Sequence, residues 1–545
     1  MSLVDRSPTA PQLAPELYGS RRSDAHATRV HAAHVRDGVR STFVVPGDWP
    51  EDTHQWHADG MSTYSTKDDN AVEFYTDGAS TYAAMVEALG TATGAGHFVI
   101  LVGWTCYDDF PLTSASDDRA GSLAGQSLRE ILISRATEGV VVRVLLWNNW
   151  FTTGPARVPG SDSTAGSVMP AMRATWMALD RAAGDLRCAI DDGTRLRGSH
   201  HQKLLIVAGA EGLIAFYGGV DVNPDRVGSG RMHDVHARVR GRAAEDLLTL
   251  AKLRWAHRLD PDGPDVFGEV ADLVHGAPTP IEDLRATAAD AGTTRVKIVQ
   301  TVGNPAIARL SSEYTDLWPS IAHALRRARH FVYLEDQYFW SLDAARELAD
   351  ALEHIAHLTI LLPHGEAASS HAAETWAEQA TTDLVSAADL RHAALSALFR
   401  EAGGHRHKIG VYQRNVAPEY IHAKTWIIDD ELAIVGSANC NRRGYGHDSE
   451  VAGVSLDRIH APWHRLEFTG AHALRMRLWR AHLGIEGARL VDGVGAAAYW
   501  RAPPRSAQIG DYMVPEDDTE VPIATWAARH SGAPFPDSRF IDPAA

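Results

Sequence analysis

The sequence predicts an α/β protein made of two repeated lobes. Three observations support this fold. Apolar strand-like runs alternate with amphipathic helical segments, the alternation occurs twice along the chain, and each round ends with His, one residue and Lys before an apolar run. Strands that alternate with helices are typical of sheets covered by helices. We therefore expect two lobes related by a pseudo-twofold axis, each with a mixed, largely parallel sheet flanked by helices.

The first half supplies helical and strand-like segments in alternation. Apolar residues recur at helical spacing in the helices, as with Met85 and Leu89, and run continuously in the strands. We expect helices over residues 76–94, Ser127–Glu138 and Ala171–Gly184, and strands over His97–Trp104, Val140–Trp147 and Leu186–Ile190. The stretch Asn148–Pro170, rich in Gly, Pro and Ser, is predicted to be a loop and is long enough to be a substrate lid.

The second half repeats this alternation, which indicates an internal duplication. We expect helices over Trp318–Arg329, Ala344–Ala356 and Thr375–Ala402, and strands over His330–Phe339, His357–Leu362 and Lys408–Tyr412.

Composition sets the boundaries around the two halves. Residues 1–71 are polar and weakly periodic and are predicted to form an arm or cap. The halves should cover residues 72–265 and 295–485, separated by a linker at 266–294. The sequence DPDGPD just before it and GAPTP within it are typical of turns and linkers. The tail, residues 486–545, is rich in Pro and acidic residues. It keeps Trp526, Phe535 and Phe540, so we expect it to pack on the body, since disordered tails are poor in aromatics.

The stretch Ile421–Asn441 carries the densest pattern of functional residue types. It contains H-x-K-x4-D followed by G-S-x-N, with these residues: His422, Lys424, Asp429, Gly436, Ser437 and Asn439. The apolar runs Thr425–Ile428 and Leu432–Val435 read as strands, so the His and Lys lie on one side of a strand mouth. The small residues at the turn let backbone N–H groups and a hydroxyl approach an anion closely. The stretch therefore predicts a phosphate pocket.

A second copy lies at Ser199–Asp225. Its matching residues are His201, Lys203, Gly218, Gly219 and Asp221. The spacing from His to the first turn Gly is three residues longer here, and Ala208 stands where the later copy has Asp429. A single short motif has a real false-positive risk, but a duplicated one is much more specific. The exits also match, because Met232–His236 and Gly446–Glu450 follow their motifs at similar distances and supply Asp234 and Glu450.

These motifs resemble those of the phospholipase D superfamily, most closely the phospholipases D proper. GGVDVNPDR fits their first-half pattern and GSANCNRRGYGHDSE their second-half pattern, and the resemblance covers about residues 72–485. It implies hydrolysis or transphosphatidylation of glycerophospholipids through a phosphohistidine, without a metal or other cofactor. It also implies that Asp234 and Glu450 each orient the opposing His, and that Gln337 and Tyr338 of a Q-Y-F strand end lie beside the pocket.

The chemistry requires two histidines in different protonation states. One His attacks phosphorus while neutral, the other protonates the leaving oxygen, and two Lys offset the charge on the non-bridging oxygens. The resemblance assigns His201 as nucleophile and His422 as general acid and then base. The near symmetry of the sequence leaves the reverse assignment open. Because both half-sites are in one chain, we expect a monomer.

Charge and cysteine content limit the alternatives. The chain has 545 residues, a net charge of −17 and a pI near 5.9, which argues against a nonspecific nucleic-acid binder. Three cysteines give no disulfide framework or zinc spacing, and no signal peptide or membrane-length apolar run is visible. We expect a cytoplasmic protein that contacts membrane surfaces transiently. A cardiolipin synthase-like phosphatidyltransferase, a nuclease, and a noncatalytic lipid- or phosphate-binding protein remain as alternatives.

Overall fold

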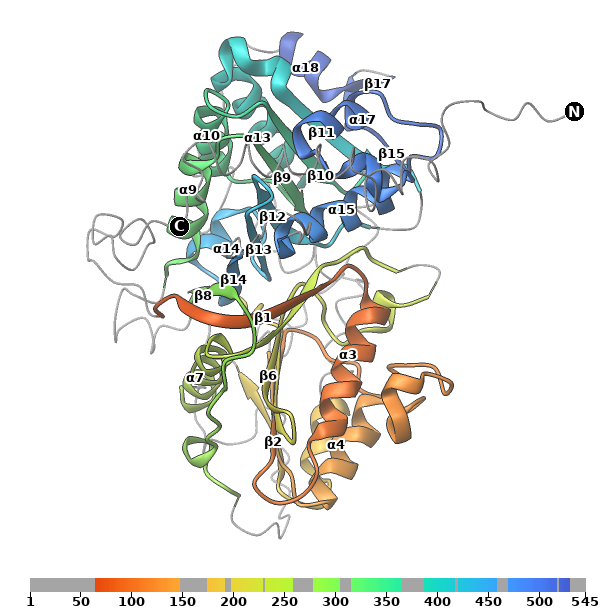
Figure 1. Cartoon of the computed structure of the whole chain (residues 1–545), viewed down its shortest axis with the longest axis vertical. Helices are drawn as coiled ribbons and strands as arrows, with labels where there is room; N and C mark the ends of the chain where they lie inside the picture. The colour runs from red at the N-terminus through yellow and green to blue at the C-terminus, as the bar shows by residue number, and fades with distance from the viewer. Residues whose placement is uncertain are drawn as a thin grey trace, which may run out of the picture.

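The computed structural model describes residues 64–147, 174–191, 198–228, 231–257, 278–303, 315–364, 387–416, 420–457, 469–516 and 519–529. Two lobes are stacked along the long axis, with the first half of the chain below and the second half above (Figure 1). Several predictions lie outside the described residues: the lid Asn148–Pro170, most of the N-terminal arm, residues 266–277 of the linker, the start of the helix Thr375–Ala402, and Phe535 and Phe540.

The elements of the first lobe confirm the predicted alternation. They are β1 (Lys67–Tyr75), α3 (Gly78–Thr91), β2 (Phe98–Gly103), α4 (Leu128–Thr137), β3 (Val141–Trp147), β4 (Leu186–Asp191), β5 (Leu204–Gly209), β6 (Gly212–Gly218), β7 (His236–Arg240) and α7 (Ala243–Ala256). Of the predicted helix Ala171–Gly184, residues 174–180 are described and helical. The helix α4 begins at a capping box, in which the hydroxyl of Ser127 accepts the N–H of Glu130 and the Glu130 carboxylate accepts the N–H of Ser127.

The second lobe repeats this order. Its elements are β8 (Thr294–Thr301), α9 (Leu317–Arg327), β9 (Phe331–Asp336), α10 (Leu342–Ala351), β10 (His357–Leu362), α13 (Ala387–Glu401), β11 (Ile409–Arg414), β12 (Lys424–Ile428), β13 (Leu432–Gly436), α14 (Arg442–Gly446), β14 (Glu450–Asp457) and α15 (Gly470–Leu483). The C-terminal segment adds α16 (Gly493–Ala496), α17 (Ala498–Arg501), β15 (Ile509–Asp511), β16 (Met513–Glu516), β17 (Thr519–Pro522) and α18 (Ile523–Arg529).

The predicted strand His330–Phe339 is shorter in the structure. It ends at Asp336, whose carboxylate accepts the backbone N–H groups of Tyr338 and Phe339 at 2.7 and 2.8 Å. Phe339 has φ of 50°, in the left-handed region, so the chain turns sharply there. The Q-Y-F residues therefore lie in a tight turn that follows the strand.

The sheets of the two lobes join into one. The described strands form a 15-stranded sheet in the order β15-β11-β10-β9-β12-β13-β14-β8-β1-β7-β6-β5-β2-β3-β4. Each strand from β1 to β7 has its counterpart from β8 to β14, and the order reverses where β1 pairs with β8. The duplicated, mixed α/β fold is therefore confirmed, with the pseudo-twofold axis at the β1–β8 junction.

The expectation of largely parallel sheets is wrong. Parallel pairing among the described strands is confined to β2–β3–β4 and β9–β10–β11. The motif strands β5 and β12 instead return at once as β6 and β13, and a hairpin can only be antiparallel. Each motif strand also pairs antiparallel with its central strand, β2 or β9.

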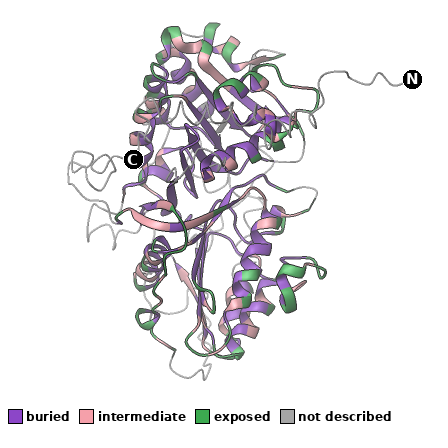
Figure 2. Ribbon diagram, viewed as in Figure 1, coloured by how far each residue is buried: buried purple, intermediate pink, exposed green. Residues whose placement is uncertain are grey.

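Three large hydrophobic cores among the described residues pack against this sheet, and a small fourth cluster contains Tyr338, Trp340 and Leu390. One core extends through both lobes and includes Leu247 of α7 and Trp479 of α15. The other two are separate: α3 and α4 cover the first lobe, and α9, α10 and α13 cover the second. Buried residues follow the strands while exposed ones gather on the outer helices (Figure 2). The shared core makes the lobes one packed unit.

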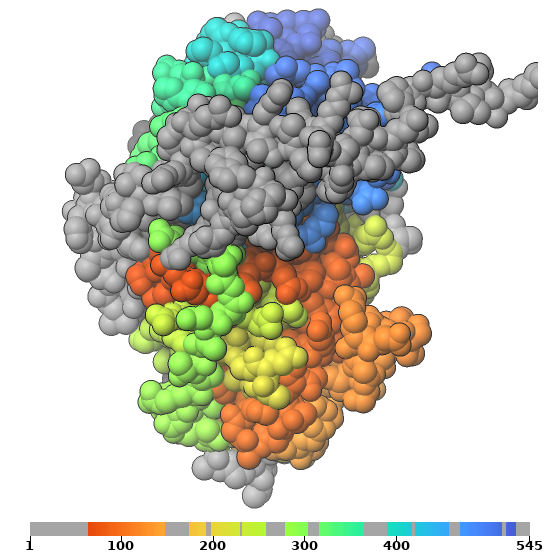
Figure 3. All heavy atoms as spheres, viewed as in Figure 1, coloured from red at the N-terminus to blue at the C-terminus, as the bar shows by residue number. Residues whose placement is uncertain are grey.

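Residues 278–293, within the predicted linker, run along the first lobe (Figure 3). Ile281 and Leu284 are buried in the shared core, and Ala288 donates its N–H to the Glu245 carboxylate at 2.7 Å. No helix within the described part of the chain is both long and apolar enough to span a bilayer.

Candidate active site

The two halves meet through crossed backbone bridges. The residue before the first motif His, His200, bridges to Ser449 at the exit of the second half, and Ile421 bridges to His233 at the exit of the first. His201 donates its N–H to Ser449 O at 2.9 Å, and His422 donates its N–H to His233 O at 2.8 Å. Each motif therefore enters beside the exit segment of the opposite half.

This crossing brings each histidine to a carboxylate of the other half. His201 Nδ1 lies 3.0 Å from Glu450 Oε1, and His422 Nδ1 lies 2.6 Å from Asp234 Oδ2. With Nδ1 held by a carboxylate, Nε2 is the ring atom left for chemistry, as in other His sites oriented by an acidic partner. His422 is fully buried, whereas His201 keeps 8% of its surface exposed.

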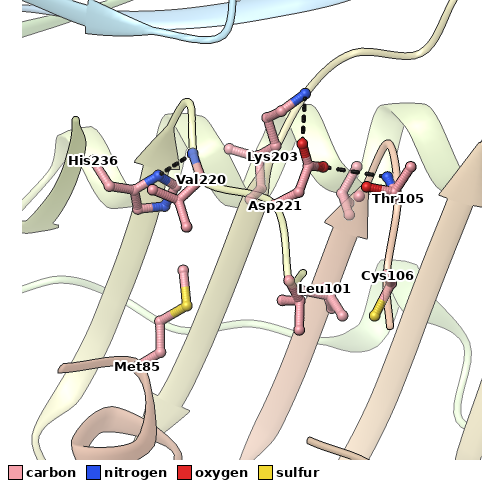
Figure 4. A pocket seen from close by; sticks show the side chains of 12 residues that line it. Met85, Leu101, Thr105, Cys106, Lys203, Val220, Asp221 and His236 are labelled. Carbon is pink, nitrogen blue, oxygen red and sulfur yellow. Dashed lines mark hydrogen bonds and ion pairs between the residues drawn. The ribbon is translucent and has the colours of Figure 1, made fainter. Parts of the chain in front are cut away.

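The two lysines lie beside the histidines but have different partners. Lys203 Nζ donates to His201 O at 2.9 Å and lies 3.3 Å from Asp221 Oδ2, whose other oxygen accepts the N–H of Thr105 at 3.2 Å (Figure 4). Lys424 Nζ donates to His422 O and, at 2.9 Å, to the side-chain oxygen of Gln337. Both ammonium groups are nearly buried, and Lys203 lies against the Asp221 carboxylate where Lys424 lies against the Gln337 amide.

The N–H groups of Gly219 and Ser437 are bonded within the protein and are not presented to an anion, contrary to the prediction for these two residues. Gly219 donates its N–H to Val235 O at 3.0 Å, and Ser437 donates its N–H to Val451 O at 2.9 Å. A Cβ on Gly219 would lie 2.0 Å from Asp234 Oδ1, and the Ser437 hydroxyl donates to Glu450 Oε2. These residues instead fit beneath the carboxylates that hold the histidines.

The first residue of each turn also has a packing role. A Cβ on Gly218 would lie 2.6 Å from His236 Nδ1, and one on Gly436 would lie 2.4 Å from the Ala452 Cβ. Two other predicted binding residues keep a small exposed surface, 7% for Asn439 and 4% for Tyr338, and their contact with substrate stays a prediction.

Asp429 lies away from the other motif residues. It follows β12, so about five residues, or roughly 16 Å of strand, separate it from Lys424. Its carboxylate accepts the N–H groups of Arg329, His330 and Phe331 at 2.7–2.8 Å. Its assignment as a catalytic residue is therefore corrected: Asp429 positions the start of β9.

The first lobe anchors its motif hairpin without a carboxylate at this position. Ala208 is buried within β5, opposite Leu213 of β6 and Phe98 of β2. The longer hairpin carries Ala210 to the end of α3, where its N–H donates to Thr91 O at 2.9 Å. The three extra residues thus connect the hairpin to the helix that precedes the central strand.

Burial and neighbouring charges shift the proton affinities of the site. Burial, with Asp448 nearby, raises the pKa of Glu450 to about 8. Burial and the cations Lys203 and Lys424 hold the pKa of His201 well below its usual value. Burial, Lys424 and Arg226 do the same to the pKa of His422. Both imidazoles are therefore neutral at pH 7 before an anion enters, and Glu450 carries a proton there while it still offers an acceptor oxygen to His201 Nδ1.

Two buried residues at the site carried no role in the sequence analysis. The ring of Trp104 meets His201 edge-on at 5.4 Å and lies 5.3 Å from Lys203 Nζ. Arg226 lies 3.5 Å from Asp221 and 3.9 Å from Asp234. Arg226 could have been found, because it ends the G-G-x-D-x4-R pattern, whereas no sequence signal marks Trp104.

One cluster outside these dyads has the composition of a metal site. His233 and His482 place Nε2 atoms 2.7 and 2.8 Å from the two oxygens of Glu335. Arg414 donates to His482 Nδ1 at 2.9 Å, so His482 Nε2 carries the proton and donates to Glu335. A metal ion needs a lone pair at that nitrogen. The hydrogen-bond order therefore accounts for the cluster without an ion.

Comparison with known proteins identifies both halves. The family model described as "Phospholipase D" matches residues 91–231, and the one described as "Cardiolipin synthase, PLD-like domain" matches residues 321–469. Phospholipase D alpha 1 of Carica papaya is 25% identical and that of Nicotiana tabacum 24% identical, each over 72% of this chain. This chain spans 63% and 62% of the lengths of those relatives.

A solved structure gives a looser match. The phosphatidylserine synthase of Haemophilus influenzae superposes with a TM-score of 0.46 and 15% identity, over 74% of this chain and 87% of that one. The two family matches each contain one His–Lys pair, and they lie in the two lobes that share the site. The chain belongs to the phospholipase D superfamily.

Proposed function

We propose that this chain is a phospholipase D-type phosphodiesterase that hydrolyses or transphosphatidylates glycerophospholipids through a phosphohistidine. One observation carries the proposal: two His–carboxylate pairs, each made from both halves, lie with two lysines at one junction. This arrangement suits a phosphorus atom between two Nε2 atoms. The plant relatives named phospholipase D support the same activity and a phospholipid substrate.

His201 is the proposed nucleophile. It is the more exposed histidine, and its depressed pKa keeps it neutral. Its Nε2 attacks phosphorus as the bond to the head-group oxygen breaks, and His422, which takes up a proton from solvent at Nε2 when the anionic substrate binds, gives that proton to the leaving oxygen. His422 then removes a proton from water or an alcohol, whose oxygen attacks phosphorus and releases His201.

Asp234 and the two lysines allow His201 to act as a neutral nucleophile while His422 carries the proton for the leaving group. Asp234, 2.6 Å from His422, favours the imidazolium once an anionic substrate enters. Lys203 and Lys424 offset the charge that builds on the non-bridging oxygens. Glu450 orients His201, and Gln337 holds Lys424 from the strand turn.

A phosphatidyltransferase is the second candidate, and the description of the second-half family match supports it. Its chemistry is the same, with a lipid alcohol as acceptor. A nuclease is disfavoured by the charge of −17, and a noncatalytic lipid- or phosphate-binding protein by the retention of both His–Lys pairs. We further propose a cytoplasmic monomer in transient contact with membrane surfaces.

Hydrolysis of bis(p-nitrophenyl) phosphate tests for an enzyme. We expect turnover by the wild type, loss in His422→Ala, and no change in the control His354→Ala, which alters an exposed histidine. Equal rates in all three proteins would leave only the noncatalytic binding function. A mixed phospholipid panel analysed by mass spectrometry then identifies the head group, and peptide mapping of a reaction quenched with cold alkali, in which the P–N bond is stable, identifies the phosphorylated histidine.

A further inference from the structure

The C-terminal segment is built into the second lobe. Its strand β15 pairs with β11, which would otherwise be the edge of the sheet. Tyr512 is fully buried, Val514 and Ile523 are nearly so, and α18 packs against α13. This segment therefore contributes to the same core as the second half-site.

A chain of buried hydrogen bonds runs from Tyr512 towards the site. Arg391 of α13 donates Nη1 to the Tyr512 hydroxyl at 3.2 Å. The same guanidinium donates Nη2 to Gln337 O at 2.7 Å and Nε to Tyr338 O at 2.9 Å. One side chain thus connects the C-terminal segment to the two carbonyls of the turn after β9.

The turn passes this constraint to Lys424. Gln337 uses its side-chain oxygen to accept from Lys424 at 2.9 Å, and its side-chain nitrogen lies 3.3 Å from the Tyr338 hydroxyl. The donor on one side and the hydroxyl on the other fix the amide orientation. The strained φ of Phe339 means that the turn needs such outside support.

The first lobe holds the equivalent turn by residues of its own half. Thr105 donates its N–H to Asp221, and Tyr107 donates its N–H to Val222 O at 2.8 Å. Asp221 also pairs directly with Lys203. Among the described residues, only the second half-site uses the C-terminal segment to position the residue that contacts its lysine.

We propose that Arg391 and Tyr512 are positioning residues for Lys424, so that the C-terminal segment takes part in binding the phosphate group. The guanidinium holds the Gln337 turn, the turn holds the ammonium, and Tyr512 holds the guanidinium. The proposal rests on the phosphate-binding part of the proposed function. Its direct readout is anion binding, which does not require turnover.

Three variants and a matched control test it. Tyr512→Phe removes one hydroxyl, Arg391→Lys keeps the charge but not the planar fork, and Arg391→Met removes both. Tyr412→Phe is the control, because Tyr412 is a buried tyrosine on the paired strand that takes no part in this chain of hydrogen bonds. Calorimetry measures the binding of inorganic phosphate. Steady-state kinetics with the chromogenic diester gives KM and kcat, and thermal melting gives Tm.

We expect phosphate affinity to fall about two- to fivefold in Tyr512→Phe and at least tenfold in Arg391→Met, with partial rescue in Arg391→Lys. KM should rise in parallel while kcat changes less, and Tyr412→Phe should match the wild type. If phosphate binding and KM stay at wild-type values in Tyr512→Phe and Arg391→Lys while only Tm falls, the segment is merely structural. Phosphate binding without any turnover by the wild type would instead contradict the proposed function and leave this inference standing.

Discussion

The two lobes have the same strand order, yet they hold equivalent site residues by different means. Lys203 faces the carboxylate of Asp221, whereas Lys424 faces the amide of Gln337. The motif hairpin of the second lobe is anchored through Asp429, and that of the first through a backbone N–H of its extra residues. The duplication therefore conserves the positions of the reacting groups more closely than the contacts that support them.

The carboxylates under the histidines make the same point. The shorter Asp234 lies against Gly219, where no Cβ would fit, and the longer Glu450 accepts a hydrogen bond from Ser437. Each half thus matches the size of its small turn residue to the carboxylate that it supports. Substitutions at the site residues therefore distinguish the chemical roles that the two lobes share from the supporting contacts that each lobe needs on its own.

The largest expected effect removes the proposed nucleophile. Adding ethanol or butanol to the wild type should divert product from phosphatidic acid to the phosphatidyl alcohol, with little change in head-group release, because water and alcohol compete for one intermediate. His201→Ala should reduce both products by at least about a thousandfold. Product mass spectrometry measures both. Phosphatidic acid at full rate, without any phosphatidyl alcohol, would indicate direct attack by water.

Exchanging the turn residues should have the next largest effect. In Gly219→Ser the new side chain would displace Asp234 from His422, and a shift of about 1 Å at such a group costs roughly a hundredfold in kcat. Ser437→Gly only removes a hydrogen bond to Glu450, so we expect a loss of about tenfold or less. Steady-state kinetics compares the two. Equal losses would show that the halves tolerate the exchange alike.

Asp429→Ala tests an anchor instead of the chemistry. It leaves three N–H groups without their acceptor: that of Phe331 is buried and its loss costs about 1–3 kcal/mol, while those of Arg329 and His330 are partly buried. Denaturant unfolding should show a loss of at least about 2 kcal/mol, with kcat near wild type below the melting transition. A collapse of kcat in fully folded protein would restore Asp429 to the catalytic group.

A smaller effect is expected on the pH dependence of stability, through Glu450. The pKa of Glu450 is raised by burial to about 8, so the folded state keeps a proton that the unfolded state releases above about 4.3. The contribution of Glu450 to stability is therefore full below pH 4.3 and is lost as pH rises to 8. Tm between pH 5 and 9 should fall more steeply in the wild type than in Glu450→Gln. Parallel curves would contradict the raised pKa.

The reacting groups could be predicted from the sequence because His, Lys and the exit carboxylates recur in short, duplicated patterns. Their cross-pairing between halves came from the family resemblance, since no local pattern shows that His422 meets Asp234. The antiparallel share of the sheet was missed because apolar runs do not report strand direction. The links through Arg391 and Trp104 depend on residues far apart in the chain, which periodicity cannot bring together.

The smallest effect on turnover is expected where the first lobe lacks the motif carboxylate. Ala210 already anchors the hairpin to Thr91, so Ala208→Asp adds no brace that the site needs. Position 208 is buried against Phe98, and an Asp there should lower stability because its carboxyl group has no polar partner prepared. In protein that remains folded at low temperature, kcat should stay within about tenfold of wild type, which is a change of under about 1.4 kcal/mol in the activation free energy.

Ala208→Ser, which adds only a small polar group, is the matched control for burial at this position. Active-site titration with the chromogenic diester corrects for unfolded protein. A large gain in kcat would show instead that the first lobe is impaired by the missing carboxylate and that the anchor through Ala210 does not replace it.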